Sequence, residues 1–196
     1  MFDTKKAALV IIDVQKAIDS YSNEERNNLD AEEKIGSLIN SWRDSKMPII
    51  HVRHASKLPA SPYHSSSQGF TFKPQVKPLE NEIVVTKQEN CAFIGTHLDK
   101  TLKELGIIEI VVCGVLVNNS VDATVRVASG LGYKVNLVHD ASATFALKTI
   151  DGRFFSSNDV HWLFLSNLHE EYCIVCSTKQ VLENLQLRAA RANEDD

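Results

Sequence analysis

Short apolar runs alternate along the chain with segments whose apolar residues recur at helical spacing. The apolar runs predict strands at residues 7–12, 49–53, 82–86, 107–113, 133–139 and 171–176. The first run is continuously apolar, which is typical of a strand buried on both faces of a sheet. The intervening segments predict helices at about residues 30–42, 96–105, 121–131, 157–169 and 177–185.

Strands that alternate with helices form parallel sheets, whose crossover connections are right-handed. The predicted fold class is therefore α/β: a three-layer, doubly wound, six-stranded parallel sheet of Rossmann-like type with helices on both faces. No repeat and no linker divides the pattern. We expect a single domain over residues 1–196, with its core at about 7–185.

Local signals sharpen some boundaries of the predicted elements. Residues 30–33 and 177–180 each have the spacing of a helix-capping box. Residues 54–78 are irregular and rich in proline and serine. A loop of this length in a small domain usually carries function, so we expect it to form a wall or lid over the site.

Polar residues stand at the ends of several predicted strands. Asp13 and Lys87 directly follow apolar runs, and Ser120 lies where a tight turn after the fourth strand becomes a helix. Asp140 follows the fifth strand and is a candidate for support. The carboxyl ends of parallel strands open on one edge of the sheet, so these residues should converge there.

Each of these residues alone also has a structural interpretation. Asp13 is a possible hydrogen-bond acceptor for a loop, Lys87 a solvated strand end, and Ser120 a helix N-cap. Together, a carboxylate, an ammonium and a hydroxyl make a hydrolytic constellation, but they do not name a reaction.

Composition narrows the class of protein. Of 196 residues, 43% are hydrophobic and 23% charged, as in ordinary globular proteins, and the net charge of -4 argues against nucleic acid or anionic lipid as a partner. No apolar run approaches the ~20 residues of a membrane span. The first residues lead directly into a strand without the layout of a signal peptide, so we expect a cytoplasmic protein.

Four cysteines are present, and Cys173 and Cys176 have the spacing of a redox or zinc pair. Positions three apart on a strand face opposite sides of the sheet, so we interpret these cysteines as small buried hydrophobes.

Four stretches carry a resemblance to a known family: LVIIDVQ at 9–15, KQENCAFIGTHL at 87–98, VCGVLVNNSVDAT at 112–124 and GYKVNLVHDA at 132–141. In this order and spacing they resemble the isochorismatase-like hydrolases, also called the cysteine hydrolase superfamily. The resemblance extends from about residue 7 to 185.

The resemblance implies roles for the strand-end residues. In the amidase members of the family, a cysteine at the helix start attacks the substrate carbonyl, the aspartate takes its proton and the lysine assists. Asp13 and Lys87 match those partners. The family also implies a cis peptide at Val115–Leu116, with the backbone N–H groups of Leu116 and Ser120 as oxyanion donors.

The departure from the family is Ser120, which stands where the amidases have cysteine. A serine hydroxyl is far less acidic than a thiol and normally needs a well-placed base. Three interpretations stay open: amide hydrolysis by a serine, acid-catalysed cleavage of a vinyl ether as in true isochorismatases, and a catalytically silent small-molecule-binding homologue. An engineered replacement of the cysteine is a further possibility.

We expect Gln15, His54, Phe93 and Asn119 to contact a small-molecule substrate. The metal-binding aspartate of nicotinamidases has no counterpart before His54, and His51 should face away from it, so we expect neither a metal nor a cofactor. By resemblance, we expect a homo-oligomer, either a dimer or a tetramer.

Overall fold

The described residues of the computed structural model, 7–21 and 24–194, form a six-stranded parallel sheet with the strand order β3-β2-β1-β4-β5-β8. The strands are β1 (Ala7–Ile12), β2 (Ile49–His54), β3 (Ile83–Lys87), β4 (Glu109–Val115), β5 (Lys134–Ala143) and β8 (Ile174–Cys176). Neighbouring strands pair in parallel throughout. The predicted parallel sheet is confirmed.

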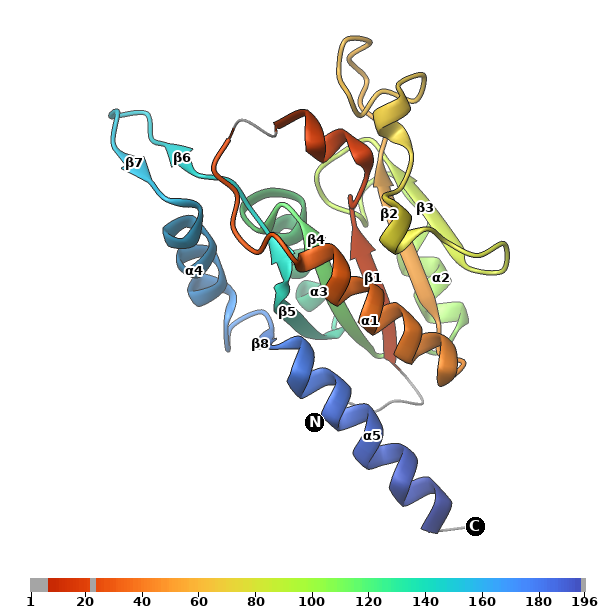
Figure 1. Cartoon of the computed structure of the whole chain (residues 1–196). Helices are drawn as coiled ribbons and strands as arrows, with labels where there is room; N and C mark the ends of the chain where they lie inside the picture. The colour runs from red at the N-terminus through yellow and green to blue at the C-terminus, as the bar shows by residue number, and fades with distance from the viewer. Residues whose placement is uncertain (1–6, 22–23, 195–196) are drawn as a thin grey trace.

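Helices cover both faces of this sheet (Figure 1). On one face lie α1 (Ala31–Asp44) and α5 (Thr178–Glu194). On the other lie α2 (Leu98–Glu104), α3 (Asp122–Gly130) and α4 (Ser157–Leu168). The three-layer α/β fold class is therefore confirmed. No helix of the described ranges has the length and apolarity needed to cross a membrane.

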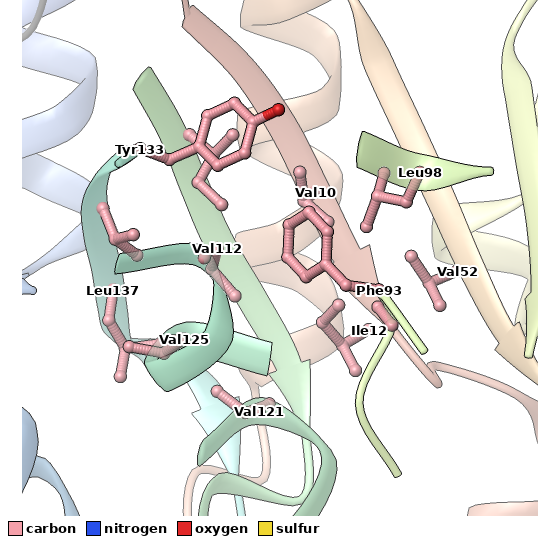
Figure 2. Packing of buried hydrophobic residues seen from close by; sticks show 14 of the residues in the cluster. Val10, Ile12, Val52, Phe93, Leu98, Val112, Val121, Val125, Tyr133 and Leu137 are labelled. Atoms are coloured by element: carbon pink, nitrogen blue, oxygen red, sulfur yellow. The ribbon is translucent and has the colours of Figure 1, made fainter. Parts of the chain in front are cut away.

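Alternating residues of β1 fill two separate cores, as the period of two in a strand requires. Val10 and Ile12 face the α2–α4 layer, where they pack with residues such as Val52, Val112 and Phe93 (Figure 2). Leu9 and Ile11 face the other layer, where Trp42 of α1 is fully buried. Because β1 is buried on both faces, its sequence is continuously apolar.

Short elements complete the chain. They are the turns η2 (Lys16–Tyr21), η3 (Gln68–Phe70) and η4 (Pro74–Val76), a π-helical turn η5 (Val117–Val121), and a hairpin of β6 (Leu147–Lys148) and β7 (Phe154–Phe155). The hairpin projects away from the sheet beside α4 (Figure 1) and was not predicted, because its strands are too short to show a pattern.

The two predicted capping boxes have different outcomes. The Ser177 N–H donates to Gln180 Oε1, and the Gln180 N–H donates to Ser177 Oγ, which confirms the box before α5. The box at α1 is wrong: Asp30 makes no side-chain cap bond and pairs instead with Lys34 one turn along the helix. A lysine four residues away competes for the carboxylate that would cap.

Strand β5 does not end at Asp140 as predicted, but continues to Ala143 through an irregularity in its pairing with β4. The register advances from Val112–Leu137 to Gly114–Ser142, and the extra β5 residues leave the ladder. Asp140 thereby turns away from the sheet edge, and its Oδ1 accepts hydrogen bonds from the Thr178 N–H and Oγ1 at the start of α5. Its role is to cap a helix.

The chain reverses its direction of strand addition between β1 and β4, and a crevice opens at such a switch point. Gly114 lies there with φ +127°, and a Cβ at this position would stand 2.2 Å from the Ile12 carbonyl oxygen. The close approach of β1 and β4 beside the crevice therefore depends on the absence of a side chain at this position.

Gly114→Ala is expected to lower the free energy of unfolding by about 2 kcal/mol or more, because it combines a disfavoured φ with a backbone clash. Gly132→Ala is the matched control, since Gly132 has φ +92° but a Cβ added there would meet no atom within 4 Å. This substitution should lower the free energy of unfolding by about 1 kcal/mol. Urea unfolding measures both. Equal losses would show that the contact with Ile12 does not matter.

Candidate active site

Three of the predicted residues are brought to the crevice by three different elements. Asp13 directly follows β1, Lys87 is the last residue of β3, and Ser120 lies in the π-helical turn between β4 and α3. Asp13 has φ +55°, a left-handed conformation that aspartate and asparagine tolerate better than most residues. Its N–H donates to the Val52 carbonyl, which fixes the turn against β2.

Lys87 connects the other two residues. Its Nζ donates to Asp13 Oδ2 at 2.7 Å and to Ser120 Oγ at 3.3 Å. A third hydrogen bond, 3.2 Å long, goes to the Glu89 carbonyl. The ammonium has three protons, so these acceptors use its full donor capacity.

All three side chains are buried, which sets the electrostatics of the group. Burial raises the pKa of the Asp13 carboxyl above its ordinary value of 3.8, and the Lys87 ammonium opposes that shift. Asp13 Oδ1 is buried and has no hydrogen-bond partner among the residues described. Asp13 therefore has one oxygen held by Lys87 and a second, buried oxygen that does not bind Lys87.

The cis peptide that the family resemblance implied is present before Ser120. The peptide bond Val115–Leu116 is cis, and the Leu116 carbonyl accepts hydrogen bonds from the N–H groups of Asn119 and Val121. Leu116 and Ser120 both line the cavity described next. Their backbone N–H groups belong to the start of a helical segment, where the helix dipole is positive.

A cavity of about 370 Å³ opens above Asp13 and Ser120. Its walls come from the ends of β1, β2 and β4, from the long loop after β2 and from the start of the β6–β7 hairpin. The lining residues are Asp13, Ile18, Tyr21, Glu24, His54, Tyr63, Asn90, Val115, Leu116, Asn118, Asn119, Ser120, Thr144, Phe145, Ala146 and Leu147. This volume suits a small organic molecule.

The four residues predicted to contact substrate take different positions. His54 and Asn119 line the cavity. Gln15 lies beneath it, fully buried, where its amide binds the backbone N–H and carbonyl of His54. Phe93 is not on the cavity wall: it is buried in the α2–α4 core, with its ring stacked on that of Tyr133 at 5.9 Å.

The position of Phe93 corrects the prediction for it, and the reason is the path of the chain after Lys87. The Ala92 N–H donates to Thr124 Oγ1 of α3, which turns the segment inward, under the sheet edge. Gln15 acts differently from the prediction too: through its bonds to His54 and to the Phe70 carbonyl, it fixes the wall without facing the cavity.

His54 lines the cavity, and the pKa of its imidazole is shifted. Burial, with the Lys87 ammonium nearby, lowers its pKa below the ordinary 6.5, so the ring is neutral at neutral pH. Its Nδ1 is buried without a hydrogen-bond partner among the described residues, and its ring packs against Tyr63.

Sequence reasoning missed several wall residues, including Glu24, Tyr63, Asn118 and Thr144. The long loop that carries Tyr63 was correctly expected to form a wall. Glu24 lies in a polar stretch with no pattern, and Thr144 follows β5, whose extension was not foreseen. In these cases the sequence contains no local signal.

None of the four cysteines lines the cavity. Cys113 and Cys173 are buried, and burial raises the pKa of both thiols, to about 12 for Cys173. No cluster of three His, Cys, Asp or Glu side chains suited to a metal occurs within the described residues. His51 binds Glu82 at 2.9 Å, far from the cavity wall where His54 lies.

Comparison with known proteins agrees with this geometry. The model of the isochorismatase domain matches residues 7–180. The chain belongs to the isochorismatase family. A family member from Chromobacterium violaceum has the same fold, with 43% sequence identity and a TM-score of 0.91 over 94% of this chain and 96% of that one.

Two curated proteins are also similar to this chain. The isochorismatase family protein YrdC of Bacillus subtilis is 35% identical over 180 residues, which cover 92% of this chain and 96% of that protein. A streptothricin hydrolase of Streptomyces noursei is 32% identical over 138 residues, covering 70% of this chain and 50% of the relative.

Removing Lys87 should destabilise the protein in a pH-dependent way. Lys87→Met leaves the Asp13 carboxylate buried without its cation, which should cost about 3 kcal/mol of unfolding free energy at neutral pH. The folded-state pKa of Asp13 then rises further. The folded state of the variant binds the extra proton, so the deficit should shrink as pH falls toward 3.8.

Urea unfolding of Lys87→Met at pH about 7 and about 5 measures this difference. The double variant Asp13→Asn/Lys87→Met should regain most of the loss, because neither charge is buried alone. Lys57→Met is the control, since Lys57 and Glu89 form an exposed pair. A deficit independent of pH would show that lost packing, rather than the Asp13 charge, causes the effect.

Proposed function

We propose that this protein hydrolyses the C–N bond of a small amide, with Ser120 as nucleophile and Asp13 as general base. The observation that carries the proposal is the position of Lys87 Nζ, within hydrogen-bond distance of both Asp13 Oδ2 and Ser120 Oγ. A hydroxyl held beside a carboxylate–ammonium pair, at the floor of a cavity, fits nucleophilic attack on a carbonyl carbon.

Activation of the hydroxyl is the demanding step. A serine needs a base stronger than an ordinary carboxylate, and burial strengthens Asp13 in that direction by raising its pKa. The free Oδ1 is the atom that accepts the Ser120 proton. The Lys87 ammonium, 3.3 Å from Oγ, stabilises the negative charge that develops on that oxygen.

The carbonyl oxygen of the substrate becomes an oxyanion as the Ser120 Oγ–C bond forms. The N–H groups of Leu116 and Ser120 are its proposed donors, at the positive end of the helical turn. Collapse of the tetrahedral intermediate breaks the C–N bond, and the Asp13 carboxyl gives its proton to the departing nitrogen. An ester of Ser120 and an amine result.

Water completes the reaction. Asp13, again ionised, takes a proton from a water molecule that attacks the ester carbonyl, and the proton returns to Ser120 Oγ as the acid leaves. The net change is amide plus water to carboxylic acid plus amine. The streptothricin hydrolase to which this chain is similar supports a hydrolytic reaction by its name.

The decisive variants are Ser120→Ala and Asp13→Asn, tested with a panel of small amides, nicotinamide and isochorismate. Each should lower kcat at least about 100-fold, because nucleophile and base are lost in turn. Asparagine suits the left-handed backbone at position 13, so the fold should survive. Ser129→Ala on α3 is the control and should keep full activity.

Ser120→Cys separates the possible outcomes further. It should retain amide turnover and accumulate an acyl adduct detectable by intact-mass spectrometry, because a thiol is the better nucleophile. Full activity in Ser120→Ala would instead assign catalysis to Asp13 acting as an acid, as in ether cleavage. Binding of amides without any turnover would identify a silent binding protein.

Two expectations from the sequence stay predictions. They are the homo-oligomer and the cytoplasmic location. Light scattering of the purified protein would measure its oligomeric state.

A further inference from the structure

We propose that the substrate carries a positively charged group and that Glu24 recognises this group on the wall of the cavity. The inference rests on the proposed amide hydrolysis, whose substrate it specifies. Asp13 and Ser120 form the reacting end of the cavity, and Glu24, which follows the turn η2, forms part of another wall.

Among the described residues, the cavity lining contains acidic side chains but no basic Lys or Arg side chain. The acidic residues are Asp13 and Glu24. Asp13 is neutralised by Lys87, whereas Glu24 has no ion-pair partner among the residues described. An anionic substrate would meet an uncompensated carboxylate there, while a cation would be attracted.

Two cations outside the cavity lining, Arg26 and Lys73, are held in ion pairs. Arg26 makes a bidentate pair with Glu32, with N–O distances of 3.0 and 2.9 Å. Lys73 binds the carboxylates of Asp19 and Glu32. These pairs leave the charge of Glu24 unopposed, and none of these cations lines the cavity.

Three aromatic side chains share the cavity lining with Glu24. Tyr21, Tyr63 and Phe145 line the same cavity, and the rings of Tyr21 and Phe145 lie 5.8 Å apart between centroids. The Glu24 N–H donates to the Tyr21 carbonyl, which links the backbones of these two lining residues. A carboxylate combined with aromatic faces is the chemistry that recognises ammonium groups.

Asp13 and Ser120 supply the reacting groups of the same cavity. A substrate that spans the cavity would place its amide carbonyl at Ser120 and its ammonium group at Glu24. The substrate class is therefore an amide whose acyl or amine part carries a cation. Dicarboxylates such as isochorismate are disfavoured by the same carboxylate.

A matched series of amides tests this directly: β-alaninamide carries a cation, butanamide is neutral and succinamate carries an anion, all with the same chain length. The expected order of kcat/KM is cation, then neutral, then anion, with about fivefold between successive members, as for a partly exposed charge pair. Added salt should compress these ratios, because Glu24 is exposed.

Glu24→Gln should bring the three values of kcat/KM to within about twofold of one another, and Glu24→Lys should invert their order. Glu33→Gln is the matched control: Glu33 is an exposed glutamate of α1 outside the cavity lining, so the order should not change. An order that is unchanged in Glu24→Gln would overturn the role of Glu24.

Equilibrium binding of the same molecules, followed by NMR titration, separates this proposal from the proposed hydrolysis. If none is hydrolysed but β-alaninamide binds more tightly than succinamate in a Glu24-dependent manner, the charge preference stands and hydrolysis fails. Hydrolysis without that preference would leave the function standing and overturn the cationic substrate. The absence of measurable binding by β-alaninamide would overturn it as well.

Discussion

The site depends on one buried ion pair. Asp13 and Lys87 come from β1 and β3, which are not neighbours in the sheet, and their 2.7 Å contact passes over the end of β2. Taking both charges out of water is costly, so the pair persists only because each partner compensates the other. The same contact places an ammonium beside Ser120 and leaves one oxygen of Asp13 free. Stability and proposed chemistry therefore share these two side chains.

The sequence predicted this convergence because it follows from topology. Parallel strands that are buried on both faces have continuously apolar sequences and can therefore be predicted. The carboxyl ends of these strands lie at one edge of the sheet. Asp13 and Lys87 end such runs, and Ser120 follows another, so all three were found without a structure. Asp140 looked identical at this level. The prediction for Asp140 failed because the pairing of β5 with β4 is irregular there; the carbonyls of His139 and Ser142 in this segment accept hydrogen bonds from Asn28.

The walls of the cavity were much less accessible to prediction. Tyr63 and Glu24 reach the cavity from segments without periodicity, whose paths are set by contacts between distant residues. Gln15 illustrates the difficulty. It lies two residues after Asp13, yet its side-chain amide forms hydrogen bonds with the backbone of His54 and Phe70 and does not line the cavity. The prediction that Phe93 contacts substrate was wrong because an apolar residue close to the site in sequence can equally well pack in the hydrophobic core, as Phe93 does.

The anchoring by Asn27 and Asn28 has a mechanical consequence. Asn27 exchanges hydrogen bonds with Thr144 through its N–H and Oδ1, and the Ala146 N–H binds the Glu25 carbonyl. These hydrogen bonds tie the wall that carries Glu24 to the wall formed by residues 144–147, so a change in the path of one segment is transmitted to the other.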